Sequence, residues 1–116
     1  MKIGRSNRTN FMKLRDEYTC PLEITHDIIK GKWKPIIIWT ISGRRKSLSE
    51  IEHSINGISQ KMLLEQLKEL VNCKIVDKKS FPGFPLKVEY FLTPHGKKLL
   101  SALEIMQETG KDILGI

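Results

Sequence analysis

Residues 58–72 carry apolar side chains at helical spacing, and this pattern predicts one short amphipathic helix. Its apolar face consists of aliphatic residues that recur every three or four positions: Leu63, Leu64, Leu67, Leu70 and Val71. Ser59 is a favoured N-cap, because its side-chain oxygen can accept a hydrogen bond from a backbone N–H of the first turn. We expect the polar positions to face outward: Gln60, Lys61, Glu65, Gln66, Lys68 and Glu69. Half of this helix therefore belongs to a core, and half faces solvent or a partner.

Two helices are predicted near the beginning of the chain. The first begins at Pro21 and runs to Lys30, because proline has the right fixed φ for the first helical position and Gly31 can close the helix. The second begins at Pro35 and is closed by Gly43. Its residues are apolar nearly all round, which predicts a central place in the core.

A third helix is predicted to begin with the capping box at residues 47–50, where Ser47 and Glu50 each accept a hydrogen bond from the other residue's backbone N–H. Asn56 and Gly57 supply a tight turn, since both residue types tolerate positive φ. The helix at Ser59 follows immediately, so the order is helix, turn, helix. A generic αα-hairpin has the same local pattern.

The pattern becomes extended after residue 72. Residues 75–81 and 87–92 read as two strands around the breakers of residues 82–85, which predicts a β-hairpin. Thr93 and Pro94 open a final helix whose apolar stripe exceeds the needs of one small core: Leu99, Leu100, Leu103, Met106 and Ile113. The predicted fold is mainly α (α+β), a winged helix-turn-helix domain with a two-stranded β wing and flanking dimerisation helices. The surplus stripe predicts a homodimer.

Length and charge add a domain division and a class of partner. The 116 residues suffice for one domain, which we assign to residues 19–116, after a basic and partly mobile arm at residues 1–18. The formal net charge of +7 predicts an anionic partner. Nucleic acid is the first candidate, and a membrane surface or an acidic protein remains open.

Several other classes are not expected. The longest apolar run, residues 36–41, is far too short to span a bilayer, and we expect no secretory signal and hence a cytoplasmic protein. Cys20 and Cys73 are too distant in sequence for a local zinc pair, and the three histidines lack partners at catalytic spacing. We therefore expect no metal, no cofactor and no enzymatic activity, and no structural disulfide in a reducing compartment.

Several separated motifs resemble a known family: Cys20-Pro21, Gly31-Lys32-Trp33, Gly57-Ile58-Ser59-Gln60-Lys61-Met62-Leu63, Pro85, Val88-Glu89-Tyr90, Leu92-Thr93 and Gly96. In order and spacing they are similar to the HxlR-type winged-helix transcriptional regulators of bacteria, which are related to the MarR group. The resemblance covers residues 20 to about 110. It implies a dimeric, sequence-specific repressor or activator that binds a double-stranded DNA operator, with the Ser59 helix in the major groove and the hairpin beside the phosphates.

The chain departs from the family pattern at three places. Ser47-Leu48 stands where the family usually has Arg-Phe, so a common basic contact is absent or supplied by neighbouring residues. Lys74 stands where a helix-closing glycine is frequent, which is a harder fit at positive φ. Thr109 stands near a usual tryptophan, so the last helix is expected to pack differently.

Two groups of residues are predicted to contact DNA. The recognition helix contributes Ser59, Gln60, Lys61, Glu65, Gln66 and Lys68. The wing and the segment before the third helix contribute phosphate contacts: Arg45, Lys46, Lys78, Lys79 and Lys87. Each of these side chains could instead be ordinary surface charge. The competing interpretation is a winged-helix module that binds an acidic protein, or DNA without sequence preference.

Cys20 is a candidate sensor of a small electrophile or oxidant, a role that the resemblance suggests. A thiol at a helix N-terminus faces unpaired N–H groups that favour the reactive thiolate, and Arg15 could add to this. A plain N-cap or packing residue is the alternative. Cys73 is expected to be a small buried hydrophobe. We expect a repressor, although the residues leave the sign of regulation open.

Overall fold

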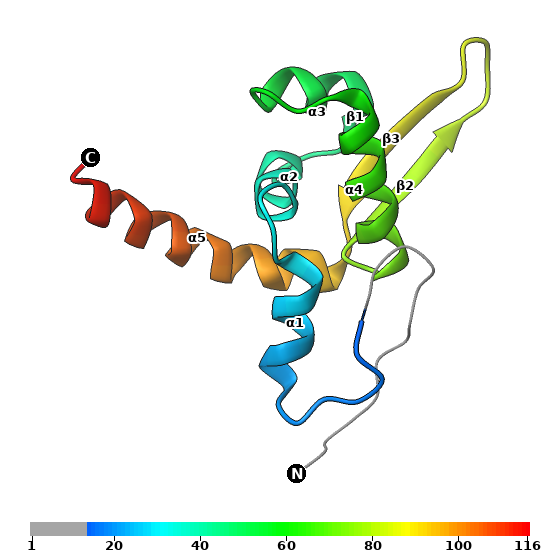
Figure 1. Ribbon diagram of the computed structural model, residues 1–116. Helices are drawn as coiled ribbons and strands as arrows, with labels where there is room; N and C mark the ends of the chain where they lie inside the picture. Colours follow the sequence, from blue (N-terminus) through cyan, green and yellow to red (C-terminus); the bar gives the residue numbers. More distant parts are fainter. Residues whose placement is uncertain (1–13) are drawn as a thin grey trace.

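The computed structural model describes residues 14–116 of the chain (Figure 1). In chain order the elements are α1 (Pro21–Ile29), α2 (Lys34–Ile41), β1 (Lys46–Ser47), α3 (Leu48–Ser54), α4 (Gln60–Asn72), β2 (Val76–Phe81), β3 (Lys87–Leu92) and α5 (Pro94–Leu114). The hairpin of β2 and β3 projects away from the helices, and α5 extends to the other side of the molecule (Figure 1). This is the predicted winged helix-turn-helix arrangement.

The predicted helix caps are confirmed. Ser47 Oγ accepts from the backbone N–H of Glu50 at 3.2 Å, and Glu50 Oε1 accepts from the backbone N–H of Ser47 at 3.0 Å. Ser59 Oγ accepts from the N–H of Met62 at 3.1 Å. Thr93 Oγ1 does the same for Gly96 at 3.1 Å. These bonds satisfy N–H groups that lack a partner within the helix, and so fix where α3, α4 and α5 begin.

The sheet contains one strand more than predicted. Its order is β1-β3-β2, and both pairings are antiparallel. Strand β1 aligns Lys46 with Tyr90 and Ser47 with Glu89. Two residues are too few to show an alternating pattern, so this strand could not be predicted. Because β1 runs directly into α3, it ties the start of the helix-turn-helix to the wing.

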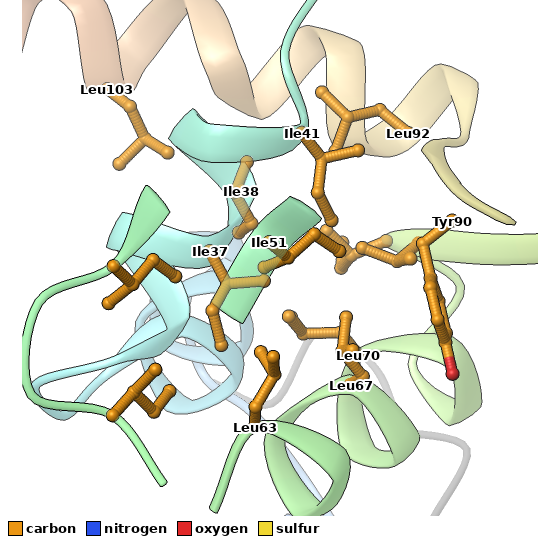
Figure 2. Close-up of a cluster of buried hydrophobic side chains, with 14 residues drawn as sticks. Ile37, Ile38, Ile41, Ile51, Leu63, Leu67, Leu70, Tyr90, Leu92 and Leu103 are labelled. Carbon is orange, nitrogen blue, oxygen red and sulfur yellow. The ribbon is translucent and has the colours of Figure 1, made fainter. Parts of the chain in front are cut away.

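The core lies between α2, α4 and the inner face of the sheet (Figure 2). As predicted for α2, Ile37, Ile38 and Ile41 are buried. Helix α4 contributes a second set of buried side chains: Leu63, Leu67 and Leu70. The two tryptophans, Trp33 and Trp39, are half-buried at its margin.

Two backbone features join α4, β2 and α5. Lys74 has φ +65°, so the position where the family often has glycine is left-handed in this chain as well. Gly96 lies so close to the chain that an added Cβ would be 2.2 Å from the carbonyl oxygen of Ile75. Thr93 Oγ1 donates to the carbonyl of Lys74 at 2.6 Å. The first turn of α5 is thereby held against the junction between α4 and β2.

Helix α5 leaves large apolar side chains exposed: Ile105, Met106, Ile113 and Leu114. Leu103, which the sequence placed on the same surplus stripe, is instead 5% exposed and packs in the core (Figure 2). The stripe is therefore shared between the domain core and an uncovered surface. Within residues 14–116, no helix is long and apolar enough to cross a membrane.

Residues 14–19 pack against α1. Leu14 and Tyr18 are buried, and the Tyr18 hydroxyl donates to Asp27 Oδ2 at 3.0 Å. Arg15 binds the same carboxylate, with Nε 3.0 Å from Oδ2. Burial raises the pKa of Asp27, but the hydrogen bonds from Tyr18 and Arg15 outweigh it, and the net pKa is lowered. The basic arm was predicted at residues 1–18. Its residues 14–18 include the buried Leu14 and Tyr18, and residues 1–13 lie outside the described residues.

Candidate nucleic-acid interface

Helix α4 presents a polar face away from the core. Leu63, Leu67 and Leu70 turn one side of the helix inward, which leaves Lys61, Glu65, Lys68 and Asn72 exposed along the opposite side. Gln60 is exposed in the first turn. The Ser59 oxygen serves as the helix cap. The predicted recognition residues therefore share one surface, with one exception.

Gln66 is the exception, because it turns toward α2. Its Oε1 accepts a hydrogen bond from Lys34 Nζ at 2.7 Å, and the same ammonium forms an ion pair with Glu69. The Lys34 side chain is only 8% exposed and that of Glu69 is 20% exposed. The prediction that Gln66 and Glu69 face outward was wrong, since both side chains contact the ammonium of the buried Lys34. Lys34 was not recognised in the sequence, because a lysine beside a helix-starting proline gives no periodic signal.

The wing carries its lysines on exposed positions of both strands. Lys79 and Lys87 lie on one face of the hairpin, where Lys79 is cross-strand from Glu89 and Lys87 from Phe81. The Lys79 ammonium lies 5.4 Å from the centre of the Phe81 ring, and the Lys87 ammonium is 3.5 Å from Glu89 Oε2. Lys78 is opposite Tyr90 and therefore lies on the inner face of the sheet.

A hollow of about 560 Å³ separates the wing from the helix-turn-helix. Its walls come from the first turn of α3, from Leu64 of α4 and from the wing between Pro85 and Tyr90. Ser47 and Ser49 add hydroxyl groups at one margin. The polar face of α4 and the lysines of the wing therefore flank a concave surface.

The basic segment before α3 is largely occupied by contacts within the protein. Arg44 Nη2 donates to Glu50 Oε2 at 2.5 Å, and Arg45 lies over the Phe91 ring at 6.0 Å from its centre. Lys46, a predicted phosphate contact, donates to the carbonyl of Thr40 at the end of α2. Hydrogen bonds from Arg44 and from the Ser47 backbone lower the pKa of Glu50 to about 2. Of the two phosphate contacts predicted in this segment, Arg45 is exposed and Lys46 is half-buried.

Cys20 is the exposed N-cap residue of α1. Its backbone N–H donates to Glu23 Oε1 at 2.8 Å, and Thr19 donates to the same oxygen. Arg15, which was expected to assist the thiolate, pairs with the carboxylates of Glu23 and Asp27. Cys73 is half-buried, and burial raises the pKa of its thiol. Cys20 is thus the more accessible of the two thiols.

The arrangement of this chain agrees with a known family. The model of the HxlR-like helix-turn-helix family matches residues 28–115. The chain belongs to this family. The matched residues include the whole helix-turn-helix and the wing, whereas Cys20 lies before the match.

Three proteins illustrate the likeness. The regulatory protein MalR of Fusobacterium mortiferum is 35% identical over 102 residues, which cover 87% of this chain and 96% of MalR. The reduced form of the redox regulator HypR is 36% identical with a TM-score of 0.76, over 80% of this chain and 92% of HypR. The reduced form of the transcriptional regulator YodB from Bacillus subtilis is 36% identical with a TM-score of 0.71, over 81% of this chain and 93% of YodB.

No group of three or more His, Cys, Asp and Glu side chains within residues 14–116 is arranged to hold a metal ion. The chemistry that this surface offers is donor-rich and cationic, since lysine side chains dominate it and Gln60 adds an amide group. Such groups bind phosphates and base edges of nucleic acid.

Proposed function

We propose that the protein is a sequence-specific DNA-binding transcription regulator that acts as a homodimer. One observation carries the proposal: the exposed face of α4 lies beside a lysine-bearing wing in a chain of the HxlR-like family. The relatives named as regulators support it. The partner is a double-stranded DNA operator, whose backbone the positive net charge favours.

The exposed groups divide into two roles. Gln60 and Lys61 stand in the first turn of α4, where recognition helices of this type contact base edges. Glu65 and Lys68 follow along the same face. Lys78, Lys79 and Lys87 of the wing and Arg45 contact phosphates, because a charge on a flexible stem carries little sequence information. Gln66 has no part in the proposed contact surface, since it faces Lys34.

The homodimer is proposed to form through α5 together with α1. The end of α5 exposes Ile105, Met106 and Ile113, and this uncovered surface continues into a hollow of about 280 Å³ between α2 and α5. The Leu22 side chain of α1 is also exposed. An exposed apolar patch of this kind is typical of a surface that a partner protein covers. A two-fold dimer presents two α4 helices to two half-sites about one helical turn, or a multiple of it, apart.

Alanine variants test the division of roles. The probe is the duplex that the full-length wild-type protein enriches from a random-sequence pool, compared with a base-shuffled duplex of the same length. Gln60→Ala or Lys61→Ala should reduce discrimination between the two by about tenfold, because a base contact is worth ~1–3 kcal/mol. Lys79→Ala should weaken both duplexes equally and lower the salt slope by about one. Unchanged discrimination in the helix variants would refute the docking of α4.

We further propose that Cys20 senses an oxidant or electrophile. The thiol is exposed at the start of α1, on the side of the fold where the dimer is proposed. The redox regulator HypR has been solved in reduced and oxidised forms and YodB after diamide treatment, and these relatives support the proposal. An electrophile adds to the Cys20 sulfur with loss of the thiol proton, or two Cys20 thiols give up two protons and two electrons to an oxidant and form one disulfide.

The sensor proposal is tested by the affinity for the enriched duplex before and after diamide. Wild type should lose affinity and regain it with dithiothreitol, whereas Cys20→Ser should keep its affinity throughout. Cys73→Ser is the matched control and should respond like wild type. Equal loss of binding in Cys20→Ser and in wild type, or no loss in either, would eliminate Cys20 as the sensor.

A further inference from the structure

The tip of the wing exposes an aromatic ring that no part of residues 14–116 covers. Phe84 is 103% exposed and Leu86 is 65% exposed. Elsewhere the aromatic side chains of the wing are at least partly covered, since Phe81, Phe91 and Tyr90 are half-buried or buried. An apolar group left in water at the end of a projecting hairpin indicates an interaction site.

The tip is also stiff and basic. Pro82 and Pro85 flank Phe84 and restrict the backbone on both sides, and Gly83 makes the turn at φ +139°. Between positions 78 and 88 the chain carries three lysines and neither Asp nor Glu. In Figure 1 the hairpin reaches beyond α3 and α4. A partner of the tip must therefore accept one aromatic ring and supply negative charge around it.

We propose that Phe84 is a wedge that enters the minor groove of bound duplex DNA and partly unstacks one base step. This inference rests on the proposed DNA-binding function and goes beyond it. The minor groove is about 6 Å wide, so it excludes the hairpin but admits a single side chain at its tip. Apolar wedges of this kind open a step and kink the duplex.

The lysines behind the tip fit the same partner. Lys79 and Lys87 lie on one face of the hairpin, behind the exposed ring and beside Glu89, and their long side chains can reach the phosphates that border a groove. The charge of each lysine offsets part of the cost of unstacking, because phosphate contacts supply affinity without reading bases. A wedge favours steps that are easily opened. We therefore expect a pyrimidine–purine step, TA or CA, at the position beneath the wing.

The experiment uses the duplex enriched from a random pool by the full-length protein, with 2-aminopurine substituted in turn at each step outside the α4 contacts. Its fluorescence rises when the base loses stacking. Four proteins are compared at saturation: wild type, Phe84→Ala, Phe84→Leu and Lys87→Ala. Phe84→Leu keeps an apolar wedge, and Lys87→Ala removes a phosphate contact without touching the ring.

We expect a fluorescence rise at one step with wild type, Phe84→Leu and Lys87→Ala, and none with Phe84→Ala. Phe84→Ala should also bind about tenfold more weakly when that step is TA, with a smaller loss when it is GC. Binding by wild type with no rise at any step overturns the wedge and leaves the regulator function standing. A changed association state of free Phe84→Ala, with the rise intact, assigns the ring to a protein partner and also overturns it. A pool that yields no enriched duplex refutes the regulator function together with the wedge.

Discussion

The ion pair between Lys34 and Glu69 should be a strong link between α2 and the recognition helix. Lys34 stands in the first turn of α2, where the helix dipole disfavours a cation, and its side chain is 8% exposed. Removal of one partner leaves the other charge buried without compensation. Because Glu69 keeps a fifth of its side-chain surface in solvent, we expect Lys34→Met to lower the free energy of unfolding by about 3 kcal/mol, at the lower end for buried pairs.

A double-mutant cycle separates this coupling from lost packing. The double variant Lys34→Met with Glu69→Met removes both charges and keeps apolar volume, so its stability should lie within about 1 kcal/mol of wild type. Lys30→Met is the matched control. Its side chain is 59% exposed and its ammonium is 3.8 Å from Asp27 Oδ1, so the change should be under about 0.5 kcal/mol.

The assay is urea unfolding followed by circular dichroism at one fixed protein concentration, because dimerisation contributes to apparent stability. If Lys34→Met costs no more than Lys30→Met, or if the two single changes add in the double variant, the pair does not clamp α2 to α4. In that case the buried position of Lys34 has no energetic consequence for the fold.

Three further predictions concern the backbone, an acidic cap and the dimer. Lys74→Gly should raise the free energy of unfolding by about 1 kcal/mol, because φ +65° strains any residue with a Cβ. The control Lys98→Gly, inside α5, should lower the free energy of unfolding by about the same amount. A lower urea midpoint for Lys74→Gly than for Lys98→Gly would contradict this. The Glu50 pKa of about 2 lies below its ordinary 4.5, so the carboxylate stabilises the fold above pH 4.5 and this contribution is lost as the pH falls toward 2. Glu50→Gln should lower the melting temperature at pH 7 and flatten its fall between pH 4.5 and 2, and a parallel pH profile would refute the role of the cap. Ile113→Glu should give a monomer in sedimentation at micromolar concentration with an unchanged circular dichroism spectrum, whereas an intact dimer would exclude this part of α5 from the interface.

Local signals were sufficient for most of the fold. Capping residues act within one turn of the chain, so Ser47, Ser59 and Thr93 could be read as helix starts before any packing was known, and all three accept the expected hydrogen bonds. The wing followed from alternation and from the breakers between its strands. Strand β1 could not be predicted, because two residues are too few to show an alternating pattern and their partner strand β3 is distant in sequence.

The candidate site was predicted less completely, for a physical reason. Helical periodicity places a residue on a face of its own helix, but a second helix decides whether that face is covered. Gln66 and Glu69 have polar side chains and were read as outward, yet both lie against Lys34, which is distant in sequence. Leu103 shows the converse: it was predicted to lie on an apolar dimer surface, but it is buried in the core of its own domain. Likewise, Lys46 was predicted to contact phosphates, but its ammonium donates to the backbone carbonyl of Thr40 in α2.

The most direct test of the proposed function is the ratio of affinities for two duplexes at one salt concentration. The first duplex is the one enriched from a random pool by the full-length protein, and the second is its base-shuffled counterpart. A regulator that reads sequence through α4 should bind the first at least about 10³-fold more tightly. Equal affinities, both falling with salt at the same slope, would contradict this account and would identify a basic winged helix that binds anionic partners without reading sequence.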